Sequence, residues 1–291
     1  MSVVSAEAIR RVAVVGAGTM GHGIAQVAAL AGCQVRLFDA VPHSAAAALP
    51  KIRASLEAAV ARGKVSAEAM GTALANLSTA NTLEEAAGAA DLIIEAIPEK
   101  MEWKQELFAR LGEICPREAL LASNTSSLSL TKIAARAVAP ERVVGLHFFN
   151  PPPVMKLLEV VRAEQTSEAA LQTALGFAAR LGKEPIVVKD SPGFATSRLG
   201  VVLGLEAMRM LQEGVAAAAD IDKAMELGYG HPMGPLRVSD LVGLDVRLAI
   251  AQTLASELSD TRFSPPEILR EKVREGKLGK KSGEGFYRWG S

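Results

Sequence analysis

The sequence has 291 residues, which suits one large domain or two domains of ordinary size. Hydrophobic residues make up 49% and charged residues 22%, as is usual for a soluble enzyme. The 32 lysines and arginines equal the 32 aspartates and glutamates in number, which argues against a nucleic-acid-binding protein or a polybasic membrane protein.

The first 40 residues predict a complete βαβ unit. A short buried strand over 11–15 precedes a glycine-rich loop, an alanine-rich helix over about 20–31 and a second strand over 34–39. A long alanine-rich helical segment over 42–77 is expected next. Strands and helices then alternate, as a strand over 91–97, a helix over 100–114, a strand over 120–123, a helix over 132–138, a helix over 167–181 and a strand over 184–188. This alternation predicts an α/β domain.

The chain changes character at Lys189-Asp-Ser-Pro-Gly193, beyond which no strand pattern is found. Four helical segments are predicted before a glycine-rich tail with aromatic residues, over 194–212, 219–227, 236–258 and 266–275. We therefore predict two domains, a Rossmann-type dinucleotide-binding domain over 1–188 and an all-helical domain over 189–291.

Signals for export, membrane insertion or metal binding are missing from the sequence. The N-terminus is too polar for a secretory signal, and no apolar run approaches the ~20 residues of a membrane span. Cys33 and Cys115 have neither metal-binding nor redox spacing and are typical of reduced thiols. We expect a cytoplasmic protein that uses no metal and binds neither a membrane nor nucleic acid.

The glycine-rich loop predicts a dinucleotide site. Its glycines lie between a strand and a helix, where they permit a sharp turn and close approach to a pyrophosphate, which the helix N-terminus then binds. Asp39 ends the next strand about 20 residues further on, can accept both ribose hydroxyls and would repel a 2′-phosphate. Glycines at this spacing also serve plain tight turns, but the context favours NAD. The expected cofactor contacts here are Gly16, Gly18, Thr19, Met20, Gly21 and Asp39.

Residues 143–161 form two apolar runs around a proline cluster, and each run carries one ionisable group. If the segment folds back near Pro153, His147 faces Glu159 across two strands. A carboxylate beside an imidazole is suited to a general base. A single strand histidine is more often an ordinary core residue, but a carboxylate between apolar neighbours is costly unless paired. The mirrored positions therefore predict a His–Glu pair.

Two further polar segments could hold a substrate. The SNTSS run over 123–127 follows a strand of the α/β domain, where ligands gather beyond the carboxyl ends of strands. Ser126 or Ser127 could equally cap the helix that follows. Asn150, three residues after His147, could contact a ligand or could be the turn residue of an Asn-Pro pair. The sequence leaves both alternatives open.

Seven collinear segments carry a family resemblance, namely GAGTMGHGIA, EAIPEKMEWKQELF, ASNTSSL, GLHFFNPPPVMKLLEVV, DSPGFATSRL, LGYGHPMGPL and GKKSGEGFY. In these segments the sequence resembles the short-chain L-3-hydroxyacyl-CoA dehydrogenases, which include bacterial 3-hydroxybutyryl-CoA dehydrogenases. The resemblance implies a Rossmann-type NAD domain followed by a helical domain that binds substrate and forms a homodimer. It also implies reversible, NAD-dependent oxidation of an (S)-3-hydroxyacyl-CoA, such as 3-hydroxybutyryl-CoA, to a 3-oxoacyl-CoA.

The resemblance gives roles to individual residues. It makes His147 the catalytic base, Glu159 its orienting carboxylate, and Ser126 and Asn150 contacts to substrate and cofactor. It adds cofactor contacts at Glu99, Lys104 and Lys281 and coenzyme A contacts at Ser55 and Arg62. Glu99, Lys104 and Lys281 could instead belong to an ordinary charged helix start or a cationic tail. Ser55 and Arg62 could lie on an ordinary solvated basic face of a helix.

One position departs from the family pattern. After PGF the family usually has two residues and then Asn-Arg, whereas this chain has Ala195-Thr196-Ser197-Arg198. The serine hydroxyl is shorter than an amide and has fewer donors, so the substrate contact expected at Ser197 is altered. This leaves room for a second hypothesis, a dehydrogenase of a hydroxy acid or sugar acid without coenzyme A. A third hypothesis is an NAD-binding sensor without catalysis. The presence of both His147 and Glu159 argues against it.

Overall fold

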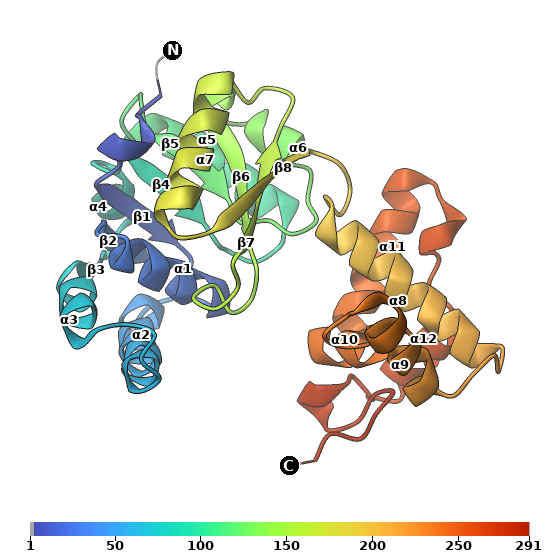
Figure 1. Ribbon diagram of the computed structural model, residues 1–291. Helices are drawn as coiled ribbons and strands as arrows, with labels where there is room; N and C mark the ends of the chain where they lie inside the picture. The colour runs from blue at the N-terminus through green and yellow to red at the C-terminus, as the bar shows by residue number, and fades with distance from the viewer. Residues whose placement is uncertain (1–2, 291) are drawn as a thin grey trace. The chain divides into compact units, whose positions relative to one another are not determined.

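The computed structural model describes residues 3–290, and the chain divides into two compact units after Asp190. Each unit has a hydrophobic core of its own. The first unit is the α/β part and the second the helical part (Figure 1). The Rossmann-type α/β fold followed by an all-helical part is therefore confirmed.

The first unit is built on one eight-stranded sheet with the strand order β3-β2-β1-β4-β5-β6-β7-β8. All neighbours are parallel except β6 and β7. Strands β4, β5 and β6 are buried at every position, because helices cover both faces of the sheet (Figure 1). The strands are β1 Arg11–Val15, β2 Gln34–Phe38, β3 Leu77–Thr79, β4 Leu92–Glu95, β5 Leu120–Ser123, β6 Val143–Phe148, β7 Leu157–Arg162 and β8 Glu184–Lys189.

The helices of this unit begin at polar caps in several places, since the side chains of Ser66, Thr82, Ser129 and Ser167 each accept a hydrogen bond from a first-turn amide. The helices are η1 Ala6–Ala8, α1 Thr19–Leu30, α2 Ser44–Ala61, α3 Ala67–Ala75, α4 Leu83–Ala87, α5 Met101–Ile114, α6 Leu130–Ala134, η2 Pro140–Arg142 and α7 Glu168–Arg180.

The single helical segment predicted over 42–77 is wrong. Helix α2 ends near Gly63, which has a φ of +66°, a conformation that closes helices and favours glycine. Ser66 then caps α3, and Leu77, the last residue of the predicted segment, belongs to the edge strand β3. The short elements β3 and α4 were not predicted from the sequence.

The fold-back over 143–161 is confirmed, with β6 and β7 antiparallel. His147 pairs with Glu159 in the register, flanked by Leu146 with Val160 and Phe148 with Leu158. Because side chains alternate along a strand, this register puts the imidazole and the carboxylate on the same face.

The second unit is helical, with two isolated β-bridges in its tail. The single helix predicted over 236–258 is wrong, because Gly243, with a φ of +102°, separates two helices. The elements are α8 Thr196–Gln212, α9 Ala218–Tyr229, α10 Pro235–Val242, α11 Leu244–Leu258, η3 Thr261–Phe263, α12 Glu267–Arg274 and η4 Lys280–Ser282. No helix within residues 3–290 combines the length and apolarity needed to cross a membrane.

The C-terminal tail is fixed to α10 by the buried carboxylate of Asp240. That carboxylate accepts hydrogen bonds from the amides of Phe286 and Tyr287 and from Nε1 of Trp289, each at 2.9 Å. A side chain at Gly285 would collide with it, since a Cβ there would lie 2.2 Å from Oδ1. Three donors of the tail therefore share one buried carboxylate.

Asp240→Ala is expected to destabilise the second unit by about 2–4 kcal/mol, because three donors would lose a buried acceptor. Thermal unfolding and protease sensitivity of residues 280–290 measure the effect. Asp220→Ala, at an exposed position of α9, is the matched control. Equal melting temperatures for the two variants would contradict this assignment.

Candidate active site

The glycine loop joins β1 to α1 at the carboxyl end of the sheet and can take only glycine at two positions. Gly16 has a φ of +104°, and a Cβ there would lie 2.5 Å from the carbonyl oxygen of Ala96. A Cβ at Gly21 would lie 1.7 Å from the carbonyl oxygen of Gly16. Helix α1 begins at Thr19, so its first amides point toward the loop. This cradle fits a pyrophosphate.

Asp39 follows β2 and stiffens the same loop. Its Oδ2 accepts a hydrogen bond from the amide of Ala17 at 2.7 Å, and its Oδ1 accepts one from the amide of Val41 at 2.8 Å. A cavity of about 790 Å³ lies beside this carboxylate and is lined by the glycine loop, Thr19, Met20, Asp39, Lys51 and Trp103, among others. Its volume is in the range of small-molecule sites. The residues present therefore fit a dinucleotide.

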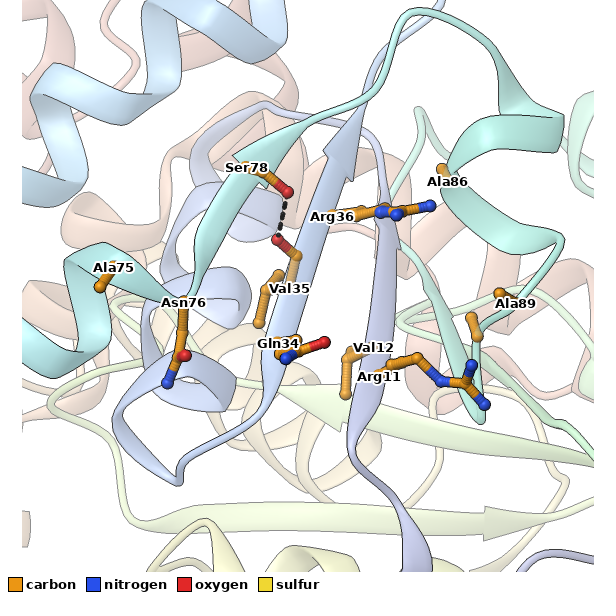
Figure 2. Close-up of a pocket in the computed structure, with 11 residues that line it drawn as sticks. Arg11, Val12, Gln34, Val35, Arg36, Ala75, Asn76, Ser78, Ala86 and Ala89 are labelled. Atoms are coloured by element: carbon orange, nitrogen blue, oxygen red, sulfur yellow. Dashed lines mark hydrogen bonds between the residues drawn. The ribbon is translucent and has the colours of Figure 1, made fainter.

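A smaller cavity of about 300 Å³ lies at the opposite, amino end of β1 and β2 (Figure 2). Its two arginines are already engaged, since Arg11 pairs with Asp91 at 2.9 Å and Arg36 donates to the carbonyl oxygen of Glu85 at 2.6 Å. Ligands of parallel α/β sheets bind beyond the carboxyl ends of the strands. This cavity is therefore not the dinucleotide site.

His147 and Glu159 meet in the buried sheet. Nδ1 of His147 lies 2.7 Å from Oε2 of Glu159, and the two residues are 6% and 0% exposed. The ring of Phe149 packs against the imidazole at 4.6 Å between centroids. A carboxylate at Nδ1 favours the tautomer with its hydrogen on that atom, so Nε2 is the nitrogen that can accept a proton. The pair has the geometry of an oriented general base.

The serine loop after β5 is tied to the histidine strand and to Glu99. Oδ1 of Asn124 accepts a hydrogen bond from the amide of Phe148 at 2.9 Å, next to His147 in the chain. Oε1 of Glu99 accepts from the amides of Ser126 and Ser127 at 2.9 and 3.0 Å. The capping alternative for Ser126 and Ser127 is wrong, because Ser129 caps α6.

An ion-pair cluster lies beneath this loop, and in it Glu95 and Lys104 are buried whereas Glu99 is partly exposed. Nζ of Lys104 contacts Oε1 of Glu95 at 2.5 Å and Oε2 of Glu99 at 3.3 Å. Burial raises the pKa of Glu95 despite the charge of Lys104. Burial acts in the same sense on Glu99, but the charge of Lys104 and hydrogen bonds from residues 125–127 outweigh it and lower the pKa. Glu95 was not singled out in the sequence, although a glutamate ending the apolar run LIIE is the same signal that identified Glu159.

The loop between β6 and β7 is held by Lys183. Its Nζ donates to the carbonyl oxygens of Pro152 and Met155 at 2.6 and 2.7 Å, and burial lowers the pKa of this lysine. Pro152 also packs on Gly23 of α1, where a Cβ would lie 2.8 Å from its Cδ. Asn150 lies exposed in this loop, ahead of a cis peptide bond to Pro151. Lys183 was not predicted, since it lies far along the chain from the carbonyls it binds.

Lys183→Met is expected to lower the free energy of unfolding by about 1–3 kcal/mol, because two carbonyls would lose their donor. Displacement of Asn150 should also raise the KM of an acyl-CoA substrate more than that of NADH. Thermal unfolding and steady-state kinetics test both effects. Lys156→Met, at a surface lysine 3.7 Å from Glu184, is the control. A Lys183→Met protein indistinguishable from this control would refute the assignment.

Comparison with known proteins identifies the family. The protein-family model described as 3-hydroxyacyl-CoA dehydrogenase, NAD binding domain, matches residues 11–191. The family model of the 3-hydroxyacyl-CoA dehydrogenase C-terminal domain matches residues 193–289. The chain belongs to the 3-hydroxyacyl-CoA dehydrogenase family. The expectation of an NAD-dependent oxidoreductase is confirmed with it.

Relatives in this family match along nearly the whole chain. A probable 3-hydroxybutyryl-CoA dehydrogenase of Bacillus subtilis is 46% identical over 279 residues, covering 96% of this chain and 97% of that protein. The 3-hydroxybutyryl-CoA dehydrogenase of Mycobacterium tuberculosis is 45% identical over 283 residues, covering 97% and 99%. The crystal structure of the (S)-3-hydroxybutyryl-CoA dehydrogenase PaaH1 from Ralstonia eutropha matches with a TM-score of 0.93 at 37% identity, covering 97% and 100%.

Within the family fold, the predicted coenzyme A contacts lie on and after α2. Ser55 is half-buried on that helix, whereas Arg62 follows its last residue and is exposed. Lys51, on the same helix, lines the dinucleotide cavity. A coenzyme A site at Ser55 and Arg62 stays a prediction.

Two further predicted contacts belong to the helical unit. Ser197 lies in the first turn of α8 and is half-buried. Lys281 lies in η4 and its Nζ donates to Asp245 at 2.6 Å. Their contacts to substrate and cofactor stay predictions. Among residues 3–290, no group of three or more His, Cys, Asp and Glu side chains could hold a metal ion.

Proposed function

We propose that this protein catalyses the reversible, NAD-dependent oxidation of an (S)-3-hydroxyacyl-CoA to a 3-oxoacyl-CoA, with His147 as the base. The buried contact of 2.7 Å between His147 and Glu159 is the observation that carries the proposal. It lies in the same sheet as a glycine loop that fits a dinucleotide. A base can therefore act together with a hydride acceptor.

The residues would divide the work as follows. NAD, when bound, accepts the hydride from C3 of the substrate. Nε2 of His147 takes the hydroxyl proton, so that the O–H and C3–H bonds break and a C3 carbonyl forms. Glu159 holds the imidazole in the right tautomer and stabilises the imidazolium, as carboxylates behind other catalytic histidines do. In the reducing direction His147 returns the proton as an acid.

Ser126 and Asn150 would hold the substrate. The amide and the hydroxyl of Ser126 both donate to Oε1 of Glu99, at 2.9 and 3.3 Å. The hydroxyl would turn from Glu99 to hydrogen-bond the reacting oxygen, while the amide stays held. Asn150 is exposed at the end of the His147 strand and can reach the thioester end. Both would also contact the cofactor, as would Glu99 and Lys104.

The substrate proposed is a short 3-hydroxyacyl-CoA such as 3-hydroxybutyryl-CoA, because several relatives carry that name. NADH consumption should be measured with acetoacetyl-CoA, with 3-oxoacyl-CoAs of increasing length, and with free 3-oxo acids and sugar acids. Turnover of the coenzyme A esters alone would support the proposal. Preference for a free acid would support the alternative function, and NADH binding without any turnover would indicate a sensor.

We further infer a homodimer through the helical unit, working in the cytoplasm. The helical unit has large apolar side chains in solvent, including Leu199, Leu227 and Tyr229. Both cysteines are free and buried, in keeping with a reducing compartment. Light scattering coupled to size-exclusion chromatography tests the dimer, and a monomer at micromolar concentration would refute it.

A further inference from the structure

Three charged side chains form a continuous chain beneath the serine loop, in which Glu95 and Lys104 are buried and Glu99 is partly exposed. Glu95 ends β4 and is fully buried, Lys104 lies in the first turns of α5 and is 1% exposed, and Glu99 lies between them in sequence. Nζ of Lys104 donates hydrogen bonds to Oε1 of Glu95 at 2.5 Å and to the carbonyl oxygen of Ile97 at 3.2 Å. It also forms an ion pair with Oε2 of Glu99, at 3.3 Å.

The two carboxylates at the ends of this chain accept hydrogen bonds from the end of β5 and from the serine loop. Oε2 of Glu95 accepts from Oγ of Ser123 at 2.6 Å. Oε1 of Glu99 accepts from Oγ1 of Thr125 at 2.6 Å and from the amides of Ser126 and Ser127. One carboxylate oxygen thus accepts hydrogen bonds from three successive residues. The ion pairs of Lys104 connect β4 and α5 to the serine loop.

We propose that Lys104 and Glu95 are positioning residues, which keep Glu99 charged and in place so that Glu99 sets the backbone and hydroxyl of Ser126. Lys104 is buried and its charge faces Oε2 of Glu99, so in this role it acts through Glu99. The cofactor contact that the family resemblance gives to Lys104 stays a prediction. Glu95 anchors Lys104 from the strand. The consequence for turnover rests on the proposed function, in which Ser126 holds the reacting oxygen.

The pKa of Glu99 depends on the charge of Lys104. The charged groups facing Glu99 are Lys104 from α5 and, behind it, Glu95 from β4, while residues 123–127 contribute hydroxyl and amide groups. Lys104 is the largest of the causes that lower the pKa of Glu99, so this pKa would rise without Lys104. Protonation of Glu99 would then weaken its hold on the two loop amides at low pH.

The test is Lys104→Met in the full chain. We expect kcat with acetoacetyl-CoA to fall by about 10–100-fold, as expected for a misplaced substrate contact. The pH profile should gain a new ionisation, with activity rising as Glu99 deprotonates. Hydrogen exchange of the amides of Ser126 and Ser127 should become faster. Lys64→Met, at an exposed turn lysine, should change none of these.

Two further variants sharpen the test. Lys104→Met/Glu99→Gln should lose the new ionisation, because the titrating carboxyl is gone. Glu95→Gln should add no new ionisation, because loss of a negative charge near Lys104 favours the charged form of Glu99. It should make the exchange of the Ser126 and Ser127 amides faster, though less than Lys104→Met does, and this exchange carries the test if Lys104→Met does not fold. A folded variant with unchanged pH profile and unchanged exchange overturns the proposal. The exchange measurement does not depend on turnover, so an inactive wild-type chain would count against the proposed function alone.

Discussion

His147→Gln is expected to lower turnover with acetoacetyl-CoA and NADH by ~10²–10⁴-fold, the usual contribution of a positioned general acid or base. Glutamine can occupy the buried position opposite Glu159, but its amide does not exchange protons near neutral pH. NADH binding should be retained, because the glycine loop and Asp39 follow β1 and β2 and are not part of β6. Steady-state kinetics and NADH fluorescence titration separate these effects.

His231→Gln is the matched control for His147→Gln. His231 lies in the helical unit between α9 and α10 and has been given no part in the site. This variant should keep the wild-type rate. Near-normal turnover of His147→Gln, with a melting temperature like that of the control, would remove His147 from the mechanism.

Glu159→Gln is the second large effect and is expected to reduce turnover by ~10²–10⁴-fold without a cavity, since the side chains have nearly the same shape. An amide that turns its NH₂ group toward Nδ1 would leave the hydrogen of the imidazole on Nε2. That tautomer cannot accept the substrate proton at Nε2. The variant also lacks the negative charge that stabilises the imidazolium.

The double variant His147→Gln/Glu159→Gln decides whether the two residues act as one unit. If they do, its loss of turnover should equal that of His147→Gln alone, because residues of one catalytic unit are far from additive. Glu184→Gln, at an exposed carboxylate of the neighbouring strand β8, is the control and should be active. Multiplied losses in the double variant would mean that Glu159 acts separately from His147.

Much of the fold could be predicted because its signals are local. The apolar runs at 11–15 and 120–123 gave the strands, and the glycine loop with Asp39 gave the βαβ unit. The mirrored positions of His147 and Glu159 gave a register that the structure confirms. The two long helices were wrong because a glycine in an alanine-rich pattern costs only about 1 kcal/mol in a helix, so Gly63 and Gly243 did not interrupt the pattern clearly.

The sequence by itself therefore determined the fold class, the dinucleotide loop and the facing histidine and glutamate, since each depends on neighbours in the chain or on one simple fold-back. Only the tertiary structure decided what supports them. Glu95 meets Ser123, and Lys183 meets the carbonyl oxygen of Pro152, across 28 and 31 positions of the chain. Such contacts leave no periodic trace in the sequence. They exist because the sheet brings distant strand ends together, where a buried charge must find a partner.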